Sequence, residues 1–75
     1  MNNRYRFITL ISQEGQYFVA RCVELGVVSQ GHSVEEATSN LREAVDLYLE
    51  DFSPDELKQY ASHPAFVSSL EFEHV

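Results

Sequence analysis

Residues 17–37 decide the fold of this chain and read YFVARCVELGVVSQGHSVEEA. The first run, Tyr17–Cys22, is rich in aromatic and β-branched residues, which predicts a strand. A short turn containing glycine separates it from a second strand-like run, Val27–Gly31. Ser33 then stands three residues before Glu36, the spacing of a capping box, in which the hydroxyl and the carboxylate each satisfy a backbone N–H at a helix start. The stretch therefore predicts two antiparallel strands that lead directly into a helix.

A further strand is expected upstream. The run from Tyr5 to Ser12 has the composition of a strand, and the polar residues 13–16 that follow include Gly15, where a hairpin needs a positive φ. The three strands form an antiparallel meander. Because apolar residues alternate onto both faces of the first strand, a single helix cannot cover both faces of the sheet.

Two helices and a last strand are expected downstream. A long helix is predicted from Val34 to about residue 50, because apolar residues recur there at three- and four-residue intervals. A second start signal lies at residues 53–56, with serine at the cap, proline at the first helical position and an acid three residues after the cap. This helix is expected to be short and to end near His63. The stretch from Ser69 to Val75 alternates apolar and polar residues, which suits a partly exposed fourth strand.

The element order is therefore β-β-β-α-α-β, an α+β fold. The long helix supplies the crossover that parallel pairing requires, so the last strand is expected to pair parallel to the first, in the spatial order 3-2-1-4. The 75 residues form one domain, residues 1–75, with room for only a thin hydrophobic core.

Composition and charge narrow the classes of function. Apolar residues make up 44% of the chain, enough for an ordinary soluble globule. Cys22 is the only cysteine, which excludes an intrachain disulfide and fits a reducing cytoplasm. The N-terminus lacks the long apolar run of a signal peptide or membrane span. A net charge of −7 disfavours direct binding to nucleic-acid phosphates and favours a basic partner.

No catalytic, cofactor-binding or metal-binding residues are expected. His32, His63 and His74 lie in different predicted elements without the short spacing of a metal-binding pair. Cys22 lies within a strand and is expected to be a core residue, and the three glycines match no phosphate-binding fingerprint. Enzymes of the ribonuclease-H-like fold hold metal ions with clustered acids, including one on the first strand, but Tyr5 to Ser12 contains none.

Residues 17–33, together with 34–37, 41–45 and 48–50, resemble the core of the HicB family of antitoxins. In that family an aromatic-rich strand leads to a Glu-Leu turn, a glycine-flanked strand, a Ser or Thr cap, a Glu-Ala pair and a long helix that ends near Tyr-Leu. The resemblance covers nearly half of the chain. One departure is that Leu25 runs directly into Gly26, where family members often carry a proline between the two.

The resemblance implies a partial ribonuclease-H-like domain without nuclease activity, which neutralises a small basic HicA-type toxin that cleaves messenger RNA. Many HicB antitoxins also carry a C-terminal DNA-binding domain, and none is expected here because the predicted last strand ends at Val75. An alternative is a stand-alone, self-assembling HicB-like module of regulatory role without a toxin. A degenerate ribonuclease-H-like enzyme is a third, disfavoured reading.

Two surfaces are expected to bind partners. The basic toxin is expected to contact acidic residues near the end of the long helix and in the following turn, namely Glu43, Asp46, Glu50 and Asp51, although a merely solvated face gives the same pattern. A homo-oligomer, most simply a two-fold dimer, is expected because one helix leaves the second face of the sheet uncovered. Ile8, Leu10 and Phe18, or their alternating neighbours, are expected to line that contact.

Overall fold

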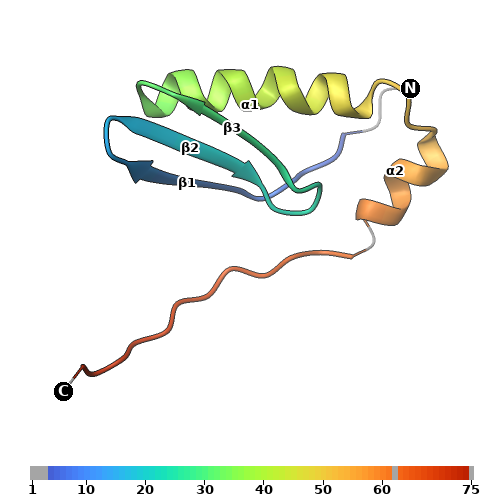
Figure 1. The fold of residues 1–75 in the computed structure, drawn as a ribbon. Coiled ribbons are helices and arrows are strands. Elements are labelled where there is room, and N and C mark those ends of the chain that lie inside the picture. Colours follow the sequence, from blue (N-terminus) through green and yellow to red (C-terminus); the bar gives the residue numbers. More distant parts are fainter. Residues whose placement is uncertain (1–3, 62, 75) are drawn as a thin grey trace.

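The computed structural model describes residues 4–61 and 63–74 of the chain. Three strands precede two helices, as expected, and the α+β class is confirmed (Figure 1). The elements are β1 (Thr9–Glu14), β2 (Tyr17–Cys22), β3 (Val27–Gly31), α1 (Val34–Leu49) and α2 (Pro54–Ala61).

The strands form one antiparallel sheet in the order β1-β2-β3. Gly15 has a φ of 61° in the two-residue turn between β1 and β2, a conformation that glycine adopts without steric cost. β1 begins four residues later than the sequence predicted and extends to Glu14, because the ladder with β2 continues to the turn. The observed first strand therefore does carry one carboxylate, at its last position.

Both helices begin at the predicted caps. The Ser33 hydroxyl accepts a hydrogen bond from the Glu36 backbone N–H at 3.0 Å, and the Glu36 carboxylate accepts the His32 backbone N–H, also at 3.0 Å. At α2 the box is fully reciprocal: the Ser53 hydroxyl accepts the Glu56 N–H at 3.2 Å, and the Ser53 N–H donates to the Glu56 carboxylate at 3.4 Å.

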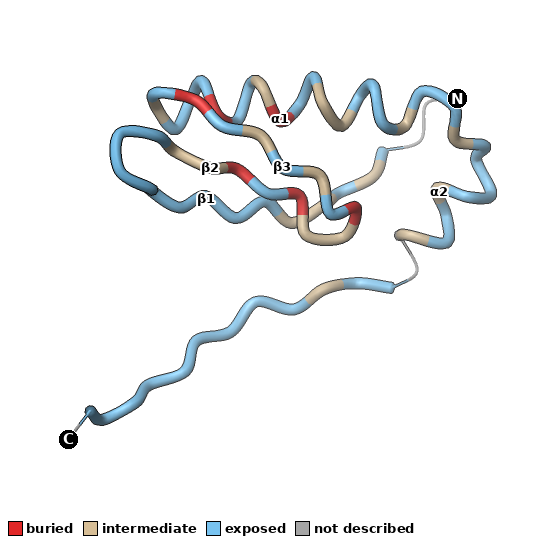
Figure 2. The backbone as a smooth tube through the Cα atoms, in the orientation of Figure 1, coloured by how far each residue is buried: buried red, intermediate tan, exposed pale blue. Residues whose placement is uncertain are grey.

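The core lies between the sheet and α1, which packs across β2 and β3 (Figures 1 and 2). Its buried residues come from β2, the following turn and the first half of α1, and they are Ala20, Cys22, Leu25, Ala37 and Leu41. Small side chains predominate in this set, so the sheet and the helix approach closely. The core is as thin as the chain length suggested.

The prediction of a fourth strand, paired parallel to the first, is wrong for the described residues. Residues 64–74 carry no strand, and the described sheet ends at β1 (Figure 1). The segment is extended chain: residues 65–68 lie beside Ile8, Leu10 and Val23, and the residues after them extend away from the sheet. Alternating side chains favour extended backbone, but the pattern does not specify which edge the backbone pairs with. Val75 lies outside the described residues.

Within the described residues, no helix combines the length and the apolar character needed to cross a membrane.

Candidate functional site

The strand register assigns side chains to the two faces of the sheet. Ile11 pairs with the buried Ala20, and Gln13 pairs with Phe18, so these residues face α1. Leu10 pairs with Arg21 and lies on the opposite face, called the outer face below. The outer face has no helix against it in the described part of the chain.

This register separates the three residues predicted for self-association. Leu10 lies on the outer face, and Ile8 and Val23 lie beside it at a small cavity. Phe18 instead faces α1 and packs against the core, so it cannot share a contact surface with Leu10. Its alternating neighbours Tyr17 and Val19 occupy the outer face in its place.

A groove runs between α1 and the segment that leads into β1. It has a volume of about 550 Å³, and it exists because α1 packs over β2 and β3 rather than over β1. Its walls are mainly apolar, and they include Phe7, Leu41, Val45 and Leu49. The inner side of β1 continues this open surface, where Ile11 is 39% exposed. The sequence did not predict the groove, because its existence depends on which strands the helix covers.

The four acids predicted for toxin binding are all exposed at the end of α1 and in the turn after it. Glu43, Asp46 and Glu50 are neighbours at helical spacing, and Asp46 also lines the groove. No side chain of these acids forms an ion pair or hydrogen bond with any described residue. The last turn of α1 holds no basic residue, so the like charges and the negative end of the helix dipole are uncompensated.

Leu47 adds an apolar group to this acidic surface. It lies four residues after Glu43 and three before Glu50, so it is their neighbour on the helix, and it is 71% exposed. Protein-binding surfaces combine such an apolar anchor with surrounding charge. We call Glu43, Asp46, Leu47, Glu50 and Asp51 the acidic surface. The helical pattern could have revealed Leu47, since it falls outside the apolar stripe.

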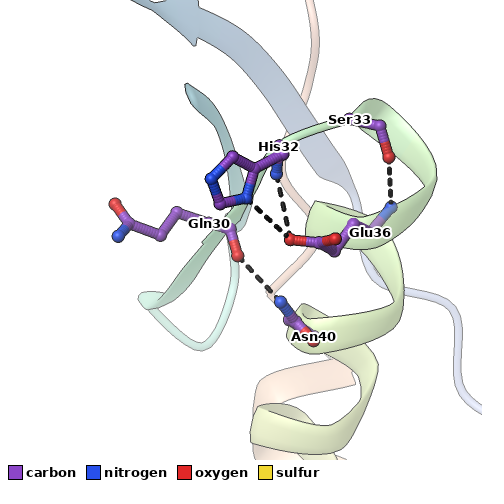
Figure 3. Close-up of polar contacts among 5 residues, drawn as sticks. All are labelled: Gln30, His32, Ser33, Glu36 and Asn40. Carbon is purple, nitrogen blue, oxygen red and sulfur yellow. Dashed lines mark hydrogen bonds and ion pairs between the residues drawn. The ribbon is translucent and has the colours of Figure 1, made fainter. Parts of the chain in front are cut away.

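His32 takes part in the cap at the start of α1 (Figure 3). The His32 ring nitrogen Nδ1 lies 3.3 Å from the Glu36 carboxylate, and its ring is 5.0 Å from that of Tyr17. The His32 backbone and side-chain hydrogen bonds lower the pKa of the Glu36 carboxyl. Nearby, the Asn40 amide donates to the Gln30 carbonyl at 2.9 Å and ties α1 to β3.

The structure assigns no chemical role to the other candidate groups. The Cys22 thiol is buried, and burial raises its pKa, which favours the unreactive protonated form. His63 follows α2, and His74 lies in the extended C-terminal segment. Among the described residues, no three of His, Cys, Asp and Glu converge as a metal site would require.

The fold and the surfaces together define a small acidic α+β domain. Its three-stranded meander is crossed by one long helix, and it exposes an acidic surface on that helix and an apolar groove beside it. The chain is 40% identical over 58 residues to a "UPF0150 protein" of Helicobacter pylori strain J99, and these residues cover 77% of this chain and 81% of that relative. The chain belongs to the UPF0150 family. It matches no family model, and no solved structure matches it significantly.

Proposed function

We propose that this chain is an antitoxin-like protein of the cytoplasm that binds and neutralises a small, basic, HicA-type ribonuclease toxin. The resemblance of residues 17–50 to HicB antitoxins supports the class of partner. Membership of the UPF0150 family is compatible with a HicB-like domain, and the net charge of −7 suits a basic partner rather than nucleic acid.

The observation that carries the proposal is the acidic surface. Its carboxylates have no basic partner among the described residues, so they repel one another and oppose the helix dipole. A cation placed there relieves both costs. A toxin that binds RNA phosphates presents clustered Lys and Arg, and covering those residues would also block RNA binding. Neutralisation then needs no chemistry by the antitoxin.

Charge and apolar contact have separate roles in this interface. Exposed charges at the rim mainly raise the association rate and make it salt-dependent. Leu47, exposed among them, supplies the apolar contact that slows dissociation. The two roles predict different kinetic effects of mutation.

The test measures binding kinetics, at low and high salt, to a small basic protein encoded by a neighbouring gene, the partner that the proposal requires. The triple variant Glu43→Lys, Asp46→Lys and Glu50→Lys should associate more slowly and lose most of the salt dependence, whereas Leu47→Ala should mainly dissociate faster. A control variant with the same net charge, Glu14→Lys, Glu35→Lys and Asp55→Lys, should retain most of the association rate.

Unchanged association by the triple variant across both salt concentrations would exclude the acidic surface from the interface. Failure of the native chain to bind any neighbouring basic protein would contradict the antitoxin proposal. It would favour the second candidate function, a stand-alone self-assembling module. One observation favours that candidate independently, namely the exposed apolar segment after α2.

A further inference from the structure

The C-terminal arm, residues 65–74, is extended and bears large exposed apolar side chains. Phe66 is 90% exposed, Leu70 80% and Phe72 85%. Because side chains of extended chain alternate between two sides, these three share one side, and Glu71 and Glu73 lie on the other. Removing large apolar side chains such as these from water is favourable. The arm therefore has the pattern of a strand whose apolar side belongs against another surface.

A free sheet edge is present at β1. The Val23 N–H donates to the Ile8 carbonyl at 2.9 Å, which directs the backbone polar groups of Ile8 toward the β2 side. These groups alternate in direction along a strand, so those of Thr9, Ile11 and Gln13 point away from β2. This edge is unpaired within the described residues. The β3 edge differs, because Asn40 of α1 already binds the Gln30 carbonyl there.

The surfaces beside this edge match the two sides of the arm. On the inner side lies the apolar groove, with Phe7 and Leu49 in its walls and Ile11 at its margin. The outer side carries positive charge, since Arg21 pairs with Leu10 there and the exposed Arg6 alternates onto the same side. An added strand with Phe66, Leu70 and Phe72 inward would fill the groove and place its acids near arginines.

The arm does not occupy the edge of its own sheet. Its first residues, 65–68, lie beside Ile8, Leu10 and Val23 on the outer face, out of the plane of the sheet. Beyond them the arm projects into solvent (Figure 1). The chain exposes 6570 Å², whereas a compact folded monomer of this mass exposes about 4,700 Å². The excess is larger than the roughly 800 Å² that each partner buries in a standard interface.

We propose that two copies of this chain exchange their C-terminal arms. Residues 65–74 of each copy add a strand to the β1 edge of the other, with Phe66, Leu70 and Phe72 over the groove and Glu71 and Glu73 on the side of Arg6 and Arg21. The exchange completes a four-stranded sheet in each half of a two-fold dimer. The exchange does not require a toxin, because the arm contacts the groove and the β1 edge; Asp46 is the one residue of the acidic surface that also lines the groove.

The first test is sedimentation velocity of the full chain at micromolar concentration. The native protein should sediment at twice its 8.6 kDa mass. The variant Leu70→Ser with Phe72→Ser should be a monomer with an unchanged α1, checked by circular dichroism. The matched control, Leu47→Ser, makes the same kind of substitution at an exposed apolar residue outside the arm and the groove and should remain a dimer.

The second test identifies which copy holds the arm. In a mixture of ¹³C-labelled and unlabelled chains, filtered NOE spectra should show contacts between Phe66, Leu70 or Phe72 of one copy and Ile11 or Leu49 of the other. A native monomer, a dimer that survives Leu70→Ser with Phe72→Ser, or arm contacts confined to one chain would each overturn the exchange.

Discussion

Gly31 lies at a position where the fold has no room for a side chain. It ends β3 directly beneath the first turn of α1, where a Cβ atom would lie 2.6 Å from the Ala37 nitrogen and 2.9 Å from the Glu36 carbonyl carbon. Backbone atoms cannot move aside as a flexible side chain can. Close packing of α1 on the sheet therefore depends on this glycine.

Gly31→Ala should lower the free energy of unfolding by about 1–3 kcal/mol, the usual cost of an overpacked site. Urea denaturation followed by circular dichroism measures it. Gln30→Ala is the control, because that side chain is exposed and its bond to Asn40 uses only the backbone carbonyl. Equal stability of the two variants would show that α1 has room to shift.

Glu36 makes the α1 cap sensitive to pH. Its pKa is lowered by the hydrogen bonds from His32, so the ionised carboxylate is favoured in the folded state. A lowered pKa contributes stability above the ordinary carboxyl range, and that stability is lost as pH falls through the folded pKa. The stability difference between the native chain and Glu36→Gln should therefore be largest near pH 7 and shrink on acidification.

Urea denaturation at several pH values from 7 to 3 gives this difference. Glu35→Gln is the control, because the Glu35 side chain makes no hydrogen bond to a described residue. A difference between native and Glu36→Gln that does not change over this range would argue against the ionised cap.

At the scale of elements, α2 is linked to α1 by three aromatic rings in contact. The Phe52 ring lies 5.2 Å from that of Tyr48 on α1 and 5.5 Å from that of Tyr60 on α2. A hydrogen bond with Tyr48 also raises the pKa of Tyr60. An eight-residue helix is marginal in water without tertiary contacts. These ring contacts therefore stabilise α2 against α1, and they also fix where the arm begins.

Phe52→Ala should shift the backbone chemical shifts of residues 54–60 toward random coil and leave those of α1 and the sheet in place. Leu47→Ala, an equally apolar truncation at a highly exposed site, is the control and should leave α2 helical. Helical shifts that persist in Phe52→Ala would mean that the α2 capping box suffices.

Sequence reasoning succeeded where the signal is local. Both serine caps, the Gly15 hairpin and the three strands follow from residues a few positions apart, and the structure has them. The C-terminal strand was predicted wrongly, and the sequence did not show that Phe18 and Leu10 lie on opposite faces of the sheet. Both depend on pairing register and on which edge is free, and an alternating pattern fixes neither. The groove was missed for a similar reason, since it depends on where α1 crosses the sheet.

For the molecule as a whole, the exposed surfaces say more about the proposed function than the buried core does. The thin core is complemented by two separate features, an acidic surface around Leu47 and an apolar arm opposite a free edge. Both point to a protein that works by binding. The groove, the free edge and the arm are the parts that the proposed self-assembly uses, and the acidic surface is the part that the proposed contact with a basic partner uses.

The most direct test of the central claim is an RNA-cleavage assay with a small basic protein encoded by a neighbouring gene, the toxin that the proposal requires. Cleavage of messenger RNA by that protein should stop as this chain approaches an equimolar amount, and the triple variant Glu43→Lys, Asp46→Lys and Glu50→Lys should inhibit much less. This chain alone, with Mg²⁺ or Mn²⁺, should leave the RNA intact. Undiminished cleavage at excess native chain, or cleavage by this chain alone, would contradict the account.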